Sequence, residues 1–383
     1  MTSQLAKRLL LLGSVLIFGV VVLELAVRLI EPRKVLRSYL TTSDPILNHK
    51  FIPGARGRFK TTEYNTEYVI NSLGLRDREI SRTKPPGVRR ILMLGDSFTE
   101  GNGVEASETF SSLLQTMIDR AGLATRWEVI NAGVGSYSPL LEYVYLKNGG
   151  LDLDPDLVIL NLDLSDVYDD LQYTALATLD ASGDPVAVRA DVVPPPSSRM
   201  VAFLVAIKDF AKEHLRLYNF LRRRIVMLGP KPDASGDIRV DKYAMLRGTF
   251  QGKEDAGWGL TYGYLTRTRD TLKARGIDFW VTVYPYGLQL SPREWGRGRL
   301  YWGFEPGKVY SAEPQQWAER FCRRQGINVI NMYSDFKALT ETTYPVYFDL
   351  DGHWRPVGHE LAAKVLFGAL LPYLRQREAS PAH

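Results

Sequence analysis

This sequence of 383 residues has only one cysteine and a small net charge, and each of these features excludes a class of function. The single cysteine, Cys322, excludes an internal disulfide and a cysteine-rich metal site, and we expect it to pack as a small apolar side chain. The formal net charge is only +5. The basic triplet Arg222-Arg223-Arg224 is typical of a solvated helix face, so we discount a nucleic-acid partner.

One long hydrophobic run is present, at the N-terminus. Residues 9–23 carry no charge, and the apolar pattern resumes after Glu24, which gives close to the roughly 20 residues of a membrane span. Glu24 and Arg28 are four residues apart and can pair on one helix face near its end. We therefore expect residues 1–31 to form an uncleaved membrane anchor. A cleaved signal peptide is the alternative, although residues 24–31 offer a poor small-x-small cleavage site.

The orientation of this anchor does not follow from charge. Lys7 and Arg8 precede the apolar run, and four basic residues follow it: Arg28, Arg33, Lys34 and Arg37. The rule that basic flanks face the cytoplasm would place the body inside the cell.

The remainder of the chain divides by composition into two parts. Residues 32–88 are rich in turn formers and predict a stalk with short lead-in strands. Residues 89–376 alternate short apolar runs with helical patterns, which predicts parallel βαβ units and a three-layer α/β/α sandwich. An insertion at about 171–255 interrupts this alternation with a hairpin pattern and a basic amphipathic helical stretch. Residues 295–310, rich in Gly, Arg and aromatic residues, suit a loop at the rim of a pocket.

Residues that directly follow strands are the first candidates for a functional site, because ligands of open parallel sheets bind beyond the carboxyl ends of the strands. Gly95-Asp96-Ser97 follows the first strand, where the glycine permits a tight turn and the serine begins a helix. Gly133 follows the second strand and Ser165 the third. Asp351 and His353 close the last strand-like segment.

A serine hydroxyl needs a neighbouring base, and that base needs an orienting acceptor. The sequence has five histidines, of which only His353 follows a predicted strand end beside carboxylates. We therefore predict Ser97 as nucleophile, His353 as base and Asp351 as the partner of His353.

Two other kinds of site fit the sequence less well. A metal site could draw on Asp349, Asp351, His353 and His359, but no second cluster completes it and Ser97 stays unexplained. A nucleotide site is rejected because the Gly133-Val134-Gly135 run lacks its third glycine and no Walker-type lysine follows Gly101-Asn102-Gly103. We predict no cofactor and no metal.

The ordered blocks resemble the SGNH (GDSL-type) hydrolase superfamily across residues 70–370. They are Gly95 to Gly101 (GDSFTEG), Asn131-Ala132-Gly133, Leu164-Ser165-Asp166 and Asp351-Gly352-His353-Trp354. The resemblance implies a flavodoxin-like fold and an oxyanion hole that includes the Ser97 amide and Gly133. The Asp-x-His-Trp block is most similar to alginate-type O-acetyltransferases, whose membrane-tethered, extracytoplasmic members share this layout. The resemblance therefore places the body in the periplasm or outside the cell, joined to the cytoplasmic membrane by the N-terminal helix.

One position departs from the family pattern. The superfamily has an asparagine in its third block as an oxyanion donor, and here Ser165 takes that position. Loss of one such donor costs on the order of 10² to 10³ in rate. Asn161 or Asp163 could fill the position if the register differs.

Three functions stay open at this stage. Serine-dependent acyl-ester chemistry on a carbohydrate or cell-envelope substrate, by O-acetyl transfer or by hydrolysis, agrees best with the motifs. A lipid or small-molecule esterase would use the same residues. A catalytically silent scaffold of a polysaccharide assembly would account for Ser165.

Overall fold

The computed structural model describes residues 2–30, 40–190, 199–218, 220–221, 241–247 and 256–378. The chain divides into two compact units. The larger unit, called the body, holds residues 35–191 and 232–383, and the smaller unit holds residues 1–34 and 192–231. The predicted insertion is therefore split between the two units.

A sheet of five parallel strands forms the centre of the body, in the order β11-β10-β7-β5-β6. These strands are β5 (Val88–Gly95), β6 (Arg126–Asn131), β7 (Leu157–Leu162), β10 (Asp278–Val283) and β11 (Asn328–Asn331). Numbered along the chain, the order is 2-1-3-4-5, which is the flavodoxin-like doubly wound arrangement. The predicted fold class is confirmed.

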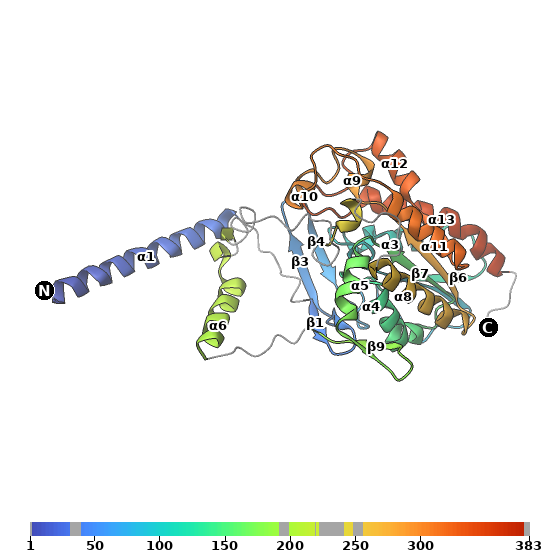
Figure 1. Cartoon of the computed structure of the whole chain (residues 1–383), viewed down its shortest axis with the longest axis horizontal. Helices are drawn as coiled ribbons and strands as arrows, with labels where there is room; N and C mark the ends of the chain where they lie inside the picture. Colours follow the sequence, from blue (N-terminus) through green and yellow to red (C-terminus); the bar gives the residue numbers. More distant parts are fainter. Residues whose placement is uncertain are drawn as a thin grey trace. The chain divides into compact units, whose positions relative to one another are not determined.

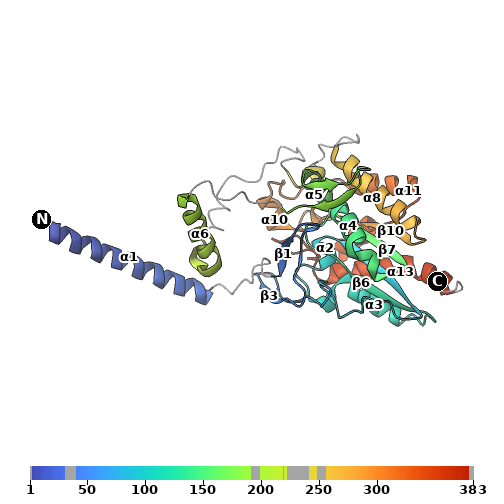
Figure 2. The same cartoon turned by 90° about the horizontal axis from the view of Figure 1, so that it is seen from below.

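The central strands are buried on both faces. Every residue of β5 and β7 is buried, which explains why each strand contains an apolar run, residues 91–94 and 157–160, and not an alternating pattern. Helices cover the two faces (Figures 1 and 2). On one side α3 (Phe110–Asp119) packs with α13 (Pro356–Glu378), and α13 also packs with α12 (Tyr333–Thr342). On the other, α4 (Pro139–Tyr145), α5 (Asp166–Thr174) and α8 (Ala256–Lys273) pack together, with α11 (Glu313–Arg324) beside α8.

The segment expected as a stalk is part of the body from residue 40 onward. It forms two antiparallel hairpins, β1–β2 (Thr41–Asp44 with Asn48–Phe51) and β3–β4 (Arg56–Lys60 with Asn65–Val69). Apolar side chains from these hairpins and their flanks, including Leu40, Phe51, Tyr68 and Ile70, are buried in a core shared with α4. The lead-in strands thus belong to the folded domain.

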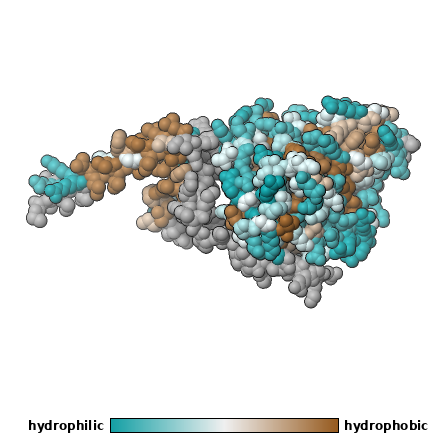
Figure 3. Space-filling view, turned by 90° about the horizontal axis from the view of Figure 1, so that it is seen from above, coloured by the Kyte–Doolittle hydropathy of each residue, from teal (hydrophilic) through white to brown (hydrophobic). Residues whose placement is uncertain are grey.

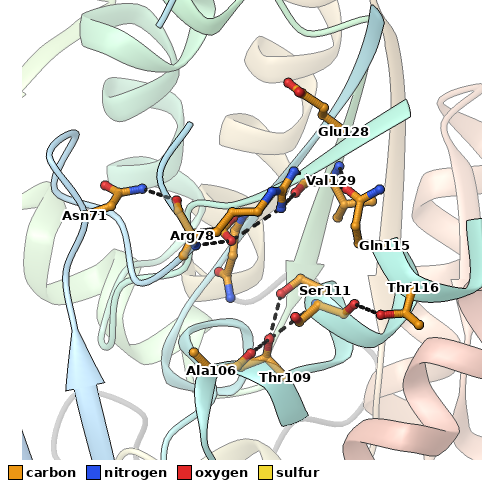
Figure 4. Close-up of polar contacts among 12 residues, drawn as sticks. Asn71, Arg78, Ala106, Thr109, Ser111, Gln115, Thr116, Glu128 and Val129 are labelled. Carbon is orange, nitrogen blue, oxygen red and sulfur yellow. Dashed lines mark hydrogen bonds and ion pairs between the residues drawn. The ribbon is translucent and has the colours of Figure 1, made fainter. Parts of the chain in front are cut away.

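Residues 71–78 fasten these hairpins to the edge of the sheet (Figure 4). The Asn71 amide donates to the Arg78 carbonyl at 2.8 Å. The Arg78 guanidinium donates to the Val129 carbonyl on β6 and to Gln115 on α3, at 3.0 and 3.2 Å. At the start of the same helix, the Thr109 hydroxyl accepts from the Ser112 amide at 3.3 Å and caps the first turn.

The predicted hairpin in the insertion is present as β8 (Ala177–Leu179) and β9 (Pro185–Val188). Residues 241–247 return to the body, where Ala244, Met245 and Leu246 are buried. The short helix α10 (Gly296–Tyr301) lies in the segment expected at a pocket rim. Another short helix, α9 (Gly287–Leu290), lies just before that segment.

The smaller unit contains α1 (Thr2–Ile30) and α6 (Arg199–His214). Residues Leu10–Leu29 have a mean hydropathy of 2.7, and the helix is long and apolar enough to cross a membrane (Figure 3). A signal sequence would have the same length and composition, so both alternatives from the sequence stand. The triplet Arg222-Arg223-Arg224 lies outside the described residues.

Candidate active site

The turn after β5 presents Ser97 at the first position of a short helix, α2 (Ser97–Glu100). The Asp96 carboxylate caps this helix by accepting from the Phe98 amide at 2.8 Å. Gly95 has φ +155, and a Cβ there would lie 2.0 Å from the Thr99 hydroxyl oxygen. Only glycine fits at this position, and the turn therefore holds Ser97 at the carboxyl edge of the sheet, beside the point where the strand order reverses.

The structure brings the three predicted catalytic residues together. His353 Nε2 lies 2.7 Å from Ser97 Oγ. On the other side of the ring, Nδ1 is hydrogen-bonded to Asp351 Oδ1. With its proton on Nδ1, His353 can accept the hydroxyl proton of Ser97 through Nε2, which is the geometry of a general base and its orienting acceptor.

The loop that carries Asp351 and His353 is fastened at several points. The Phe348 amide donates to the His353 carbonyl at 2.8 Å, and Tyr347 and Trp354 form an antiparallel bridge. The Glu63 carboxylate, on the β3–β4 hairpin, accepts from the amides of Leu350 and Asp351 at 3.0 and 2.9 Å. The hairpin expected as a stalk thus positions the loop.

Two side chains that the sequence analysis did not select contact the Asp351–His353 pair. The Tyr64 hydroxyl donates to Asp351 Oδ2 at 3.1 Å. The Asn102 amide nitrogen lies 3.4 Å from Asp351 Oδ1 and 3.2 Å from His353 Nδ1. Asn102 could have been noticed, since it stands five residues after Ser97 between two glycines. Nothing in the sequence connects Tyr64 with the site.

Electrostatic interactions between Asp351 and His353 favour the ionised form of Asp351, which a general base at His353 requires. Burial raises the pKa of Asp351, but the adjacent His353 and the Tyr64 hydrogen bond outweigh burial and keep it below its usual value. Burial lowers the pKa of His353, and the negative charge of Asp351 outweighs it, so that the pKa lies above 6.5. Asp351 is therefore ionised when His353 is neutral.

A small cavity of about 40 Å³ opens onto Ser97 and His353. The cavity is larger than the roughly 10–15 Å³ needed for one water molecule. Trp295, from the segment expected at a pocket rim, lines it together with Lys242 from the end of the insertion. The other lining residues are Asp96, Phe98, Asp163, Tyr243, Tyr286, Asp351 and Gly352.

Gly133 and Ser165, the two oxyanion donors expected beside Ser97, do not line this cavity. The Gly133 amide donates to the Asn131 side chain at 2.9 Å, and a Cβ at Gly133 would lie 2.4 Å from the Glu100 nitrogen. The Ser165 hydroxyl donates to Asp163 Oδ2 at 2.6 Å. The glycine thus permits close packing against α2, and the hydrogens of both expected donors are used within the fold.

The two alternative residues for the third block differ in position. The Asn161 side chain is buried and bonds to the Leu94 carbonyl at 2.7 Å and to the Thr282 hydroxyl at 2.7 Å. Asp163 does line the cavity, where it accepts from the Tyr286 hydroxyl at 2.8 Å. A carboxylate there is an acceptor and adds negative charge, so when ionised it cannot replace the donor that the family pattern places in this block.

Three buried carboxyl groups lie behind Ser97, those of Asp96, Asp163 and Asp166. One oxygen from each lies within 4.8 Å of the others, an arrangement that could hold a cation among the described residues. Burial and the neighbouring Asp163 raise the pKa of Asp96 to about 8, and burial likewise raises that of Asp166. Bound protons can therefore take the place of a cation.

The four residues considered from the sequence as metal ligands have other partners in the structure. Asp349 forms an ion pair with Arg297 at 2.5 Å. His359 is buried, its Nδ1 lies 3.3 Å from the Phe110 amide, and burial lowers its pKa to about 3. Asp351 and His353 are already paired with each other.

Residues 251–382 match a family model described as the SGNH hydrolase-like domain of the acetyltransferase AlgX. This match covers the Asp351–His353 block and confirms the resemblance to the SGNH superfamily. No curated protein matches the sequence.

Three solved structures show an overall similarity to the chain. A lipolytic protein of the G-D-S-L family from Desulfitobacterium hafniense DCB-2 is 12% identical over 73% of this chain and 99% of its own, with a TM-score of 0.38. The acetyl xylan esterase AlAXEase is 13% identical over 73% and 99%, with a TM-score of 0.39. A catalytic mutant of the acetylxylan esterase Axe2 from Geobacillus stearothermophilus is 10% identical over 75% and 95%, with a TM-score of 0.41. The strand order of the sheet, and not these low scores, defines the fold.

Proposed function

We propose that Ser97 is the nucleophile of a serine-dependent acyl-ester reaction, O-acetyl transfer or ester hydrolysis, on a carbohydrate or cell-envelope substrate outside the cytoplasmic membrane. The observation that carries the proposal is the chain of contacts from Ser97 Oγ to His353 Nε2 at 2.7 Å and from His353 Nδ1 to Asp351. The match of residues 251–382 to an acetyltransferase domain supports the same chemistry.

The reaction has two halves. Ser97 Oγ attacks the ester carbonyl carbon while His353 Nε2 takes its proton, and a tetrahedral oxyanion forms. His353 then gives the proton to the leaving alcohol as the ester bond breaks, which leaves an acyl-Ser97. In the second half His353 deprotonates either water or an acceptor hydroxyl, and that oxygen attacks the acyl carbon. His353 then returns the proton to Ser97 Oγ as the acyl–Oγ bond breaks.

Two donors are suited to the oxyanion. The Ser97 N–H stands at the first position of α2, where an N–H has no acceptor within its own helix. The Lys242 ammonium lines the same small cavity and adds a positive charge. In this proposal the Ser97 amide acts as expected from the sequence, and Lys242 takes the place of Gly133 and Ser165 as the second donor.

The size of the cavity favours a short acyl group. A cavity of about 40 Å³ suits an acetyl group better than a long fatty chain. The aromatic residues Tyr243, Tyr286 and Trp295 lie around it and offer ring faces and edges to a sugar. Both features favour acetylated carbohydrate over the lipid-esterase alternative.

The proposed location rests on α1. Its length and hydropathy suit a single span of the cytoplasmic membrane, and the resemblance to extracytoplasmic acetyltransferases places the body on the outer side. We propose that α1 stays on the mature chain. A protease added to intact spheroplasts should then digest the body, and digestion only after lysis would contradict this placement.

A silent scaffold is the second candidate function, and one observation favours it. The hydrogens of both Gly133 and Ser165 are used within the fold, which leaves fewer oxyanion donors than the family pattern has. The scaffold and the enzyme differ in whether Ser97 reacts.

Labelling of Ser97 distinguishes the two candidates. The full chain in detergent should react with a fluorophosphonate probe and release acetate from p-nitrophenyl acetate, with much slower release of octanoate from the matching ester. Ser97→Ala and His353→Ala should abolish both reactions, while Ser182→Ala, an exposed turn serine, should not. No labelling of the unmodified chain would favour the scaffold. Addition of acetylatable oligosaccharides then separates transfer from hydrolysis.

A further inference from the structure

We propose that α6 lies in the interfacial layer of a lipid bilayer, beside the end of α1, with one apolar stripe among the acyl chains. The proposal rests on the placement of α1 in the membrane, which is part of the proposed function, and it does not depend on the chemistry of Ser97. The stripe consists of Met200, Phe203, Leu204 and Ile207.

These four side chains share one face of α6. Their spacing of i, i+3, i+4 and i+7 is that of an apolar helical stripe about 100° wide. They are exposed by 68%, 62%, 56% and 48%. Soluble surfaces seldom present so many large apolar side chains together, and such a patch marks a surface that another apolar phase covers. Ala206 and Lys208 lie to either side of the stripe and are also exposed.

The length of α6 distinguishes an interfacial position from a second span. Its 16 residues extend about 24 Å, which is less than the hydrocarbon thickness of about 30 Å. Lys208 within the helix would be costly at the centre of a bilayer but can reach the headgroups from its edge. A helix of this kind lies along the membrane surface.

A cluster of hydrogen bonds joins the end of α1 to the residues that follow α6. The Glu24 carboxylate accepts from the amides of Arg216 and Leu217 at 3.0 and 2.8 Å, and from Arg28 Nε at 2.7 Å. The Arg216 guanidinium donates to the Arg28 carbonyl at 3.1 Å. The charge near the end of the candidate span is thus satisfied by the chain just after α6.

This cluster identifies a lipid surface as the phase that covers the stripe. Glu24 and Arg28 stand near the C-terminal end of the span, where the chain leaves the hydrocarbon layer. Arg216 comes two residues after α6 ends at His214, so the cluster fixes that end of α6 at the membrane boundary. Both helices belong to one compact unit. The bonds also give α1 a structural role in the mature protein, which a cleaved leader would lack.

Site-directed spin labelling of the full chain in liposomes of phosphatidylethanolamine and phosphatidylglycerol tests the proposal. Single nitroxides are attached at Phe203→Cys and Ile207→Cys on the stripe, at Ala206→Cys and Lys208→Cys beside it, and at Val20→Cys within α1. The native Cys322 is buried and its pKa is raised to about 12, so it reacts slowly with the label. Collisions with lipid-soluble oxygen and with a water-soluble nickel chelate are then compared.

The labels at 203 and 207 should collide several-fold more with oxygen than with nickel, as the label at 20 does, and those at 206 and 208 should show the reverse. Nickel access at 203 and 207 equal to that at 206 and 208 would overturn the proposal and leave the α1 span intact. Exclusion of both reagents at 203 and 207 would show that protein covers the stripe, which also overturns it. Nickel access at 20 would overturn the membrane placement as well.

A second variant tests the hydrogen-bond cluster. Glu24→Ala should reduce the contrast between the labels at 207 and 208, because the amides of Arg216 and Leu217 lose their acceptor. An unchanged contrast would overturn the role of Glu24. Fluorophosphonate labelling of Ser97 in the same samples reports separately on the proposed function.

Discussion

The ammonium nitrogen of Lys242 lies 3.9 Å from Oδ2 of Asp169, at a distance that leaves its hydrogens available to a ligand. Burial lowers the pKa of Lys242, but Asp169 and the other carboxylates around it outweigh burial and raise the pKa above its ordinary value. A positive charge therefore stands at the edge of a cavity whose lining also includes three aspartates and the base His353. The insertion thereby supplies a charge to the site that the strands do not.

Replacement of Lys242 should slow acyl transfer to Ser97. In Lys242→Met the oxyanion loses a charged donor, and we expect kcat for p-nitrophenyl acetate to fall by on the order of 10² with a smaller change in KM. Lys242→Arg should recover part of the rate. Lys308→Met, at an exposed lysine, is the control. Equal kcat in Lys242→Met and the unmodified chain would remove Lys242 from the mechanism.

The pH dependence of the reaction should follow His353. The neutral imidazole is the active form, and because its pKa is raised above 6.5, the rate should increase with pH through a midpoint above 6.5. Asp351→Asn removes the largest of the charges that oppose burial, those of Asp351, Asp96 and Asp163, so the midpoint should move to lower pH while the rate falls by on the order of 10⁴. The rate of acetate release between pH 5 and 9 measures both effects. A midpoint that does not move would show that Asp351 has no electrostatic effect on His353.

Glu142 should make the body less stable as the pH rises. Its carboxyl oxygens are buried and have no hydrogen-bond partner among the described residues, and burial together with Asp96 and Asp170 raises its pKa well above 4.5. The folded chain then holds a proton that the unfolded chain releases above pH 4.5, so stability is lost with increasing pH by up to about 1.4 kcal/mol per unit.

Glu142→Gln removes this dependence. The free energy of unfolding of the variant, minus that of the unmodified chain, should be larger at pH 8 than at pH 5. Urea denaturation at the two pH values measures this difference. Glu360→Gln, at a half-exposed side chain on α13, should show no such trend. A constant difference between the two pH values for Glu142→Gln would mean that the carboxyl group titrates normally.

Arg76 should be important for the stability of the loop after α2. Its guanidinium is buried, donates to the carbonyls of Glu100, Gly101 and Val104, and lies 3.7 Å from the centre of the Tyr68 ring.

Arg76→Met removes a donor from three carbonyls, although the Gly101 carbonyl still accepts from the Val104 amide at 3.3 Å. The substitution should cost roughly 3 kcal/mol or more in the free energy of unfolding. Arg58→Met, at a side chain that is half exposed, should change it by less than about 0.5 kcal/mol. Equal urea-denaturation midpoints for Arg76→Met and Arg58→Met would contradict the structural role given to Arg76.

The sequence predicted the central strands well because β5 and β7 are buried on both faces and therefore contain apolar runs, as in Ile91 to Leu94. The position of Ser97 followed from the same pattern, because ligands bind at the carboxyl edge of a parallel sheet. Asp351 and His353 were expected at the end of a strand, but they lie in a loop between Tyr347 and Trp354, which form an isolated antiparallel bridge.

Other parts of the site could not be found in this way. Glu63 and Tyr64 reach the site from a hairpin whose strands are short and largely exposed, and no periodicity connects them with Asp351. Gly133 and Ser165 occupy the expected strand ends, but hydrogen-bond direction decides what a donor can do, and their bonds point to Asn131 and Asp163. Lys242 comes from an insertion that no strand pattern places.

The hydrogen bond between Tyr64 and Asp351 joins residues that are 287 positions apart in the chain. Ser97 therefore has no oriented base until nearly the whole polypeptide has been synthesised and folded. A chain that is still being synthesised therefore carries a serine without its base. The proposed reaction can begin only after the loop with Asp351 and His353 has folded against Ser97.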